Sequence, residues 1–341
     1  MGLGFSFLIA CALILGVMLG VEVLGLNYLF AVIIPYLAFG VFFFGFIAKI
    51  LKWARSPVPF RIPTTCGQQK SLPWIKQNKI DNPSSKAGVV ARMALEVLLF
   101  RSLFKNTKAD LHEGGKLTYQ WEKWLWLFGL IFHWSFFLVI VRHLRFFLDP
   151  VPGFIRILEN VDGFFHVDLQ ALYLTGFGLL LAVTFLFLRR VVIPQVRYVS
   201  LAADYFPLFV LFTIAATGIL MRYFSRVDVV AIKELAMGLV TFSPTVPEGI
   251  SVLFYIHIFM VSTLLAYFPF SKLMHMGGIF MSPTRNMANN NRAERHINPW
   301  NPVVEVHTYE AYEDEFREKM AAVGLPLEKE LSKDEAAATK A

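Results

Sequence analysis

Six long apolar stretches dominate this sequence and constrain its fold more than any other feature. They cover approximately residues 3–23, 28–50, 121–142, 167–188, 205–223 and 250–270, the last with an extension to 275. A helix needs about 20 consecutive apolar residues to cross the hydrocarbon core of a bilayer. We therefore predict an all-α integral membrane protein, a helical bundle of about six transmembrane helices with a cytoplasmic insertion and a C-terminal tail.

The composition agrees with a membrane protein. The 341 residues are 56% hydrophobic and only 17% charged, whereas soluble domains carry about 25% charged residues. The net charge of +7 is typical of membrane proteins, because Lys and Arg collect in their cytoplasmic loops. The expected surroundings are therefore membrane lipid, and no nucleic acid partner is predicted.

The cysteines and the N-terminus exclude several further classes. Cys11 lies in an apolar stretch and Cys66 in a polar one, and two distant cysteines build no disulfide framework, zinc site or iron–sulfur cluster. The N-terminus lacks a basic region and a small-residue cleavage site, so the first apolar stretch is predicted to be a retained span.

The spans divide the chain into four predicted parts. Between the second and third spans, a polar insertion contains the apolar stretch 89–104, which three charged residues interrupt, Arg92, Glu96 and Arg101. Such a stretch favours an amphipathic interfacial helix over a span. The charged tail is too polar to fold alone and is expected on a partner or partly disordered. The predicted parts are two N-terminal spans (1–51), the cytoplasmic insertion (52–120), a four-helix domain (121–282) and a cytoplasmic tail (283–341).

Basic residues predict the orientation. They are frequent in the insertion, after the fourth span (Arg189, Arg190 and Arg197) and after the sixth (Arg285, Arg292 and Arg295). These regions lie on one side of a six-span protein, and basic loops stay in the cytoplasm. We expect a multi-pass protein of the cell inner (cytoplasmic) membrane with both termini in the cytoplasm.

Four of the eight histidines lie in or at the ends of apolar stretches: His133 and His143 in the third, His257 and His275 in the sixth. Three crossings separate these two spans, so they run antiparallel. His133 and His275 therefore belong to the cytoplasmic half, and His143 and His257 to the outer half. Two pairs of neutral imidazoles that face each other across a bundle can hold two bis-histidine haems, and we predict that these four residues are the iron ligands.

The spacing permits this pairing but requires a distortion. Ten residues between His133 and His143 correspond to about 15 Å of helical rise, and eighteen between His257 and His275 to about 27 Å. His257 and His275 share a helix face, while His133 and His143 are about 80° apart around theirs. Tilted helices are therefore expected, or a bend at Pro269.

Other polar residues near these histidines have two interpretations each. Arg142 and Arg145 at the outer end and Lys272 at the inner end could bind haem propionates, or could simply extend toward the membrane surface. His166 stands between Asp162 and Asp168 and could accept a proton from a quinol, or be an ordinary interfacial histidine. We assign no chemistry to His112, His296 or His307.

The two ligand segments, FHWSFFLVIVRH and HIFMVSTLLAYFPFSKLMH, resemble the dihaem cytochrome b (gamma) subunit family of respiratory nitrate reductase over roughly residues 120–280. This resemblance implies that His143 and His257 hold an outer haem b and His133 and His275 an inner one. The extra N-terminal span and the polar segment RIPTTCGQQKSLPWIK are more similar to the DsrM family, the haem b membrane subunits of sulfite-reductase-associated electron-transfer complexes.

The family resemblance also implies a function. Menaquinol would be oxidised near the outer haem, and electrons would pass through the inner haem to a cytoplasmic iron–sulfur subunit similar to heterodisulfide reductase, in sulfite or sulfur metabolism. The chain would then be an electron-transfer subunit of a quinol-linked oxidoreductase complex, docked through the insertion and the tail, with the direction of electron flow open. The alternatives are a six-span proton-coupled transporter, which would require acids or lysines paired with the histidines inside the spans, and a haem-free membrane anchor subunit.

Overall fold

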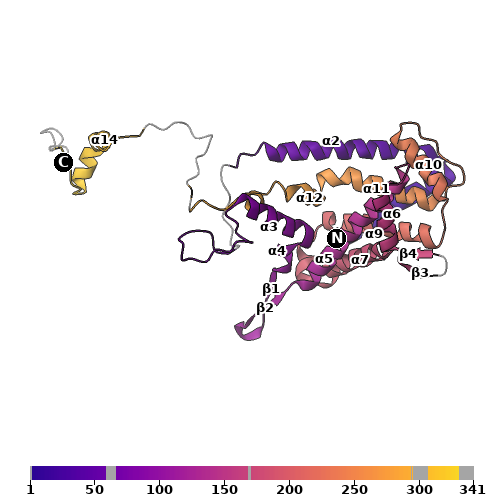
Figure 1. The fold of residues 1–341 in the computed structure, drawn as a ribbon, viewed down its shortest axis with the longest axis horizontal. Coiled ribbons are helices and arrows are strands. Elements are labelled where there is room, and N and C mark those ends of the chain that lie inside the picture. The colour runs from indigo at the N-terminus through magenta and orange to yellow at the C-terminus, as the bar shows by residue number, and fades with distance from the viewer. Residues whose placement is uncertain (1, 59–66, 168–169, 293, 295–305, 330–341) are drawn as a thin grey trace. The chain divides into compact units, whose positions relative to one another are not determined.

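The computed structural model describes residues 2–58, 67–167, 170–292, 294 and 306–329. The chain divides into two compact units, residues 1–295 and 296–341. The first unit contains the long helices drawn in Figure 1.

Within the described residues, six helices are long and apolar enough to cross a membrane, which confirms the predicted helical membrane bundle. Several continue through short turns of π- or 3₁₀-helix. In chain order the spans consist of α1 (Gly2–Met18) with η1 (Leu19–Val23), η2 (Leu29–Ile33) with α2 (Ile34–Ala54), α5 (Lys123–His143) with η4 (Leu144–Phe146), α7 (Leu174–Val192), α9 (Ala202–Tyr223), and α11 (Val252–Tyr267) with η5 (Phe268–Phe270).

Neighbouring spans pack in the order α5, α7, α9, α11 and α2, with α1 against α9. Buried side chains such as Phe30, Val210, Tyr255 and Met260 form one continuous core between them. A small residue permits one close approach: a Cβ added to Gly45 of α2 would lie 2.9 Å from Cβ of Pro269. The bundle therefore holds α11 and the residues after it against α2.

The ends of two spans differ from the prediction. The fourth begins at Leu174 rather than 167, because a short hairpin of β3 (Phe165–Val167) and β4 (Gln170–Leu172) precedes it. The sixth helix changes to a 3₁₀ turn at Pro269, which lacks the N–H needed to continue an α-helix. His275 consequently opens a separate short helix, α12 (His275–Gly278), after the 3₁₀ turn η6 (Lys272–Met274).

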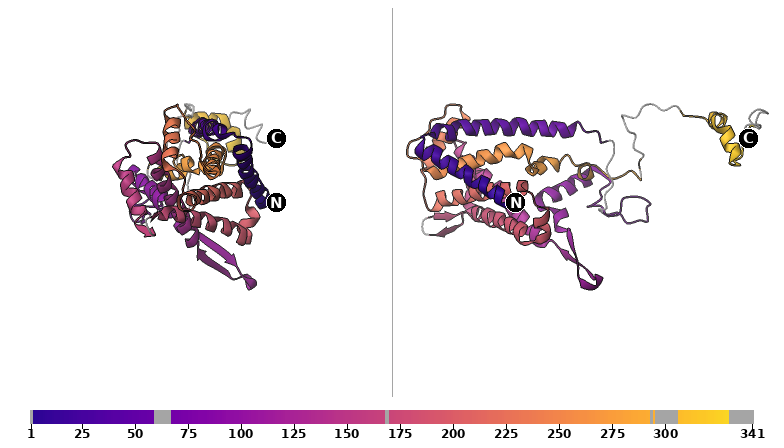
Figure 2. Two further views of the ribbon diagram at one scale, coloured as in Figure 1. Left: turned by 90° about the vertical axis from the view of Figure 1, so that its right-hand side faces the viewer. Right: turned by 180° about the vertical axis from the view of Figure 1, so that it is seen from behind.

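The described part of the insertion contains two α-helices and a hairpin. The predicted amphipathic helix over 89–104 is divided into α3 (Lys86–Leu99) and α4 (Arg101–Phe104), because Phe100 between them has a left-handed backbone (φ 50°). Strands β1 (Thr107–Leu111) and β2 (Leu117–Trp121) then form an antiparallel hairpin that sequence analysis did not predict. It leaves the bundle sideways in both views of Figure 2.

The start of the predicted C-terminal tail packs back on the insertion. Arg92 of α3 donates to the carbonyl of Thr284 at 3.2 Å, on α13 (Pro283–Asn286). The backbone N–H of Asn289 donates to the carbonyl of Pro83 at 2.8 Å. The remaining short helices of this unit lie in loops: α6 (Gly153–Asp162), α8 (Pro194–Val199), α10 (Val229–Val240) and the single 3₁₀ turn η3 (Glu113–Gly115).

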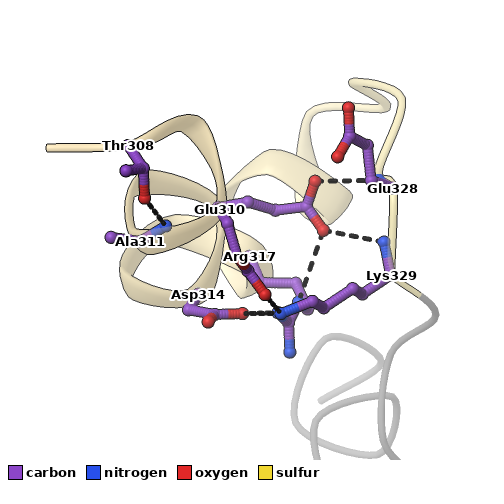
Figure 3. A network of polar contacts seen from close by, with 8 residues as sticks. Thr308, Glu310, Ala311, Asp314, Arg317, Glu328 and Lys329 are labelled. Atoms are coloured by element: carbon purple, nitrogen blue, oxygen red, sulfur yellow. Dashed lines mark hydrogen bonds and ion pairs between the residues drawn. The ribbon is translucent and has the colours of Figure 1, made fainter.

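The described part of the second unit is one helix, α14 (Tyr309–Ala322), with a loop folded against it (Figure 3). Thr308 caps its first turn by accepting from the N–H of Ala311. The buried carboxylate of Glu313 accepts from the N–H groups of Glu328 at 2.8 Å and Lys329 at 2.9 Å, and these bonds lower the pKa of Glu313 below its ordinary value. This part of the predicted polar tail thus has local structure of its own.

Candidate functional site

Four histidines, two from α5, one from α11 and one from α12, lie in two pairs. The ring centres of His133 and His275 lie 5.8 Å apart with their planes at 84°. Those of His143 and His257 lie 6.4 Å apart with their planes at 12°. The structure therefore brings together the same two pairs that depth in the membrane predicts, each with one ring from α5.

Hydrogen bonds orient all four rings by the same nitrogen. Three Nδ1 atoms lie close to backbone carbonyls of their own segment: His133 to Gly129 O at 2.8 Å, His143 to Val139 O at 2.7 Å, and His275 to Lys272 O at 2.9 Å. A carbonyl only accepts, so Nδ1 of these rings carries the proton. Nε2 then keeps its lone pair for another partner.

The fourth ring is held by a side chain from another span. Nδ1 of His257 on α11 lies 2.9 Å from Oγ1 of Thr217 on α9. The Thr217 hydroxyl itself lies 2.7 Å from the carbonyl of Thr213 and donates to it, so its oxygen accepts from the imidazole N–H. Within the described residues, hydrogen bonds engage none of the four Nε2 atoms, so in the neutral form of each ring this nitrogen is available as a ligand.

The ring separations fit ligation of one metal ion by each pair. With a metal–imidazole bond of about 2.0 Å and about 1.1 Å from nitrogen to ring centre, two imidazoles on opposite sides of a metal have centres about 6.2 Å apart. The observed 5.8 and 6.4 Å are close to this value. Among the described residues no three His, Cys, Asp or Glu side chains cluster at metal-binding spacing. A donor set of two imidazoles suits haem iron, whose four remaining ligands come from the porphyrin.

The insertion packs directly beside the inner pair. The ring of Phe100 contacts the His133 ring edge-to-face, with centres 4.8 Å apart. Two tryptophans of α5 donate to carbonyls at the end of α3: Trp134 Nε1 to Leu98 O at 3.0 Å, and Trp126 Nε1 to Leu99 O at 2.7 Å. These bonds satisfy carbonyls that a helix end leaves without partners, and so they fasten α3 to the ligand helix.

Each cation predicted to bind a propionate contacts a carboxylate in this structure. Arg142 Nε lies 3.1 Å from Asp162 Oδ2, with its guanidinium 3.9 Å above the ring of Tyr173. The other two pairs are Arg145 with Glu159 at 2.8 Å and Lys272 with Asp204 at 2.7 Å. Binding of propionates by these three residues stays a prediction.

His166 lies on β3, exposed to solvent, with Nδ1 3.2 Å from the carbonyl of Phe164. Of its two acidic neighbours in sequence, Asp162 contacts Arg142 and the hydroxyl of Thr175, and Asp168 lies outside the described residues. The proposed proton-accepting role of His166 therefore stays a prediction.

The remaining histidines have no assigned role in the site. His112 shares a hydrogen bond with Thr118 in the insertion hairpin at 2.8 Å, and His307 is exposed. His296 and Cys66 fall outside the described residues. Sequence analysis did not identify Thr217, Phe100 or Trp134. The spacing of Trp126 and Trp134, about two helical turns apart, could have indicated that their N–H groups make polar contacts at one surface of α5.

Six span-length helices and two histidine pairs define a multi-pass helical membrane protein with two places where imidazoles lie in pairs. The chain belongs to the nitrate reductase gamma subunit family, which matches residues 86–291. The matched region includes α3, the insertion hairpin and all four paired histidines.

Two archaeal proteins are similar over most of their length. Both carry the name "Hdr-like menaquinol oxidoreductase cytochrome b-like subunit". The protein from Archaeoglobus fulgidus is 46% identical over 284 residues, which cover 81% of this chain and 85% of the relative. The protein from Archaeoglobus profundus is 43% identical over 276 residues, 79% and 82% of the two chains. The predicted nitrate reductase gamma resemblance is thereby confirmed, while the particular similarity to the DsrM family stays a prediction.

Proposed function

We propose that this chain is the dihaem cytochrome b subunit of a membrane respiratory complex. His143 and His257 hold the outer haem b, and His133 and His275 the inner one. The observation that carries this proposal is the geometry of the two pairs: ring centres at 6.4 and 5.8 Å, with every Nδ1 hydrogen-bonded. Family membership and the cytochrome b-like relatives support it.

In this proposal each histidine pair binds one haem, and the residues around the pair orient the two imidazole rings. A bound haem supplies a one-electron carrier whose potential depends on its axial ligands and on their hydrogen bonds. Acceptors at Nδ1 fix the tautomer and make Nε2 a better donor to iron. The two sites lie at different depths, so together they form a path across the bilayer.

We propose that the path connects menaquinol or menaquinone with a cytoplasmic iron–sulfur partner in sulfite or sulfur metabolism. The names of the two relatives support menaquinol as the substrate. The partner resembles heterodisulfide reductase and docks, with other subunits, on the insertion and the tail. His166 accepts a quinol proton at the outer side of the membrane. The chain lies in the cell inner (cytoplasmic) membrane, with both termini in the cytoplasm.

A pyridine haemochrome assay and a dithionite-reduced spectrum of the purified chain test the proposal. About two b haems per chain are expected. His143→Ala and His257→Ala should each remove the same spectral component, and His133→Ala and His275→Ala the other. His112→Ala, in the exposed hairpin, is the matched control and should keep both components. Absence of alpha-band absorbance in the unmodified chain would refute the proposal and leave the transporter or anchor, and loss of different components within one pair would refute the ligand assignment.

A further inference from the structure

The β1–β2 hairpin has an apolar face that is exposed throughout. Its register pairs Ala109 with Tyr119 and Leu111 with Leu117, and places these residues with Trp121 on one face of the two strands. The larger of these side chains are all exposed: Leu111 at 74%, Leu117 at 49%, Tyr119 at 68% and Trp121 at 59%. A two-stranded hairpin with such a face is marginal in water, so the face requires a cover.

The opposite face is polar and already has partners. Lys108 forms an ion pair with Asp110 at 3.1 Å on the same strand. The hydroxyl of Thr118 lies 2.8 Å from Nε2 of His112. The hairpin is therefore amphipathic across its thickness, with these polar contacts on one face and exposed apolar side chains on the other.

The apolar face is continuous with the surface of a span. Only Glu122 separates the end of β2 from α5, whose membrane-length segment begins at Lys123. Phe104 bridges the two elements, with its ring centre 6.1 Å from that of Trp121 on the hairpin and 4.9 Å from that of Trp126 one turn inside α5. The aromatic row thus passes from the span onto the hairpin without interruption.

The chemistry of this row matches the membrane–water interface. Trp and Tyr concentrate at the level of lipid headgroups, where an apolar ring and a polar edge are both satisfied. The ammonium group of Lys123 lies 4.5 Å from the centre of the Trp121 ring. A second basic residue, Lys116, lies in the turn between the two strands. Basic side chains at this level attract headgroup phosphates. The hairpin points away from the spans in Figures 1 and 2, so it extends beyond the bundle rather than over it.

We infer that the β1–β2 hairpin is a membrane-interface anchor: its face of Leu111, Leu117, Tyr119 and Trp121 lies in the headgroup layer beside α5, on the side of the membrane where the insertion lies. The partner of this face is the lipid surface itself. The anchor fixes the start of the ligand helix α5 relative to the bilayer, independently of whether haem is bound.

Site-directed spin labelling of the full chain in nanodiscs of phosphatidylcholine and phosphatidylglycerol tests this inference. Cys11 and Cys66 are replaced by Ser, and single cysteines are introduced by Leu117→Cys on the apolar face or by Thr118→Cys, the adjacent position on the polar face. Power saturation then compares collisions with oxygen, which is enriched in lipid, and with a water-soluble nickel chelate. We expect the label at position 117 to have a several-fold higher oxygen-to-nickel ratio than the label at 118.

Two results would overturn the inference. One is equal access of the nickel chelate to both labels in the nanodisc. The other is protection of position 117 only in the purified complex with its other subunits, which would make the face a protein interface. Circular dichroism and size-exclusion chromatography of each labelled chain establish that the bundle is intact, so that a change in access reports on the hairpin alone.

Discussion

Nδ1 of His257 and the hydroxyl oxygen of Thr217 lie 2.9 Å apart, on two different spans. Backbone carbonyls hold the other three paired histidines. Among the described residues, His257 is therefore the member of the set with a side-chain partner, and a single substitution can remove that hydrogen bond.

Thr217→Val should alter the outer site alone. Valine preserves the shape but removes the acceptor, and an unpaired buried N–H costs about 1–3 kcal/mol. Loss of such a partner typically lowers metal affinity about 10–100-fold. The less basic imidazole should also raise the potential of one of the two b-type components in a redox titration. Thr217→Ser should restore the behaviour of the unmodified chain.

The matched control for that variant is Thr213→Val. The hydroxyl of Thr213 bonds to the carbonyl of Phe209 in its own helix at 2.9 Å, so its loss should leave both components unchanged. Equal potentials in Thr217→Val and the unmodified chain would show that Thr217 does not act on the outer site.

Trp134→Phe should loosen α3 from α5. The variant keeps an aromatic ring but loses the N–H that donates to Leu98 O at 3.0 Å. A net loss of about 1 kcal/mol is expected, seen as faster amide hydrogen exchange in the last turn of α3. Trp124→Phe, at a position 68% exposed, is the control and should exchange like the unmodified chain. Identical exchange in both variants would contradict a fastening role for Trp134.

Two ion pairs on α6 should differ strongly in their contribution to stability. The side chains of Arg142 and Asp162 are 11% and 7% exposed, whereas those of Arg145 and Glu159 are 38% and 16% exposed. Asp162→Asn leaves a buried guanidinium without its counter-charge, at a cost of about 3–5 kcal/mol. Glu159→Gln should cost no more than about 1 kcal/mol. Unfolding of the two variants in mixed detergent micelles measures the difference, and equal losses would contradict it.

Strong acid should loosen the insertion by protonating Asp81. Burial opposes ionisation of this carboxyl, but hydrogen bonds from Lys105, Arg101 and Asn78 outweigh it and hold its pKa below the ordinary value of 3.8. A depressed pKa means that the stabilisation is fully present above 3.8 and is lost as pH falls through the lower pKa of the folded state.

The protection of α4 from hydrogen exchange, corrected for the intrinsic rate, is therefore expected to stay constant from neutral pH to about 5 and to fall only in stronger acid. Asp81→Asn should lower protection at neutral pH and remove this acid step. An acid step that persists in Asp81→Asn would assign it to another group.

The six spans and the pairing of histidines by depth could be predicted because both depend on local properties of the chain. Apolar length determines whether a segment crosses a bilayer, and alternation of direction then assigns each residue to one half of the membrane. His133 thus faces His275, and His143 faces His257, as chain direction alone requires. The break after α11 was also partly readable, since Pro269 cannot continue a helix.

The tertiary structure decided what no local pattern encodes. The left-handed Phe100 ends α3 where its ring meets His133, although that residue type does not favour such a backbone. Asp162 and Glu159 reach their cations from the next helix, α6, and Asp204 reaches Lys272 from α9. Thr217 reaches His257 from another span. Sequence therefore determined which segments enter the membrane and at what depth their histidines lie. The hydrogen bonds that orient those histidines depend on how the helices pack side by side, and this only the folded bundle specifies.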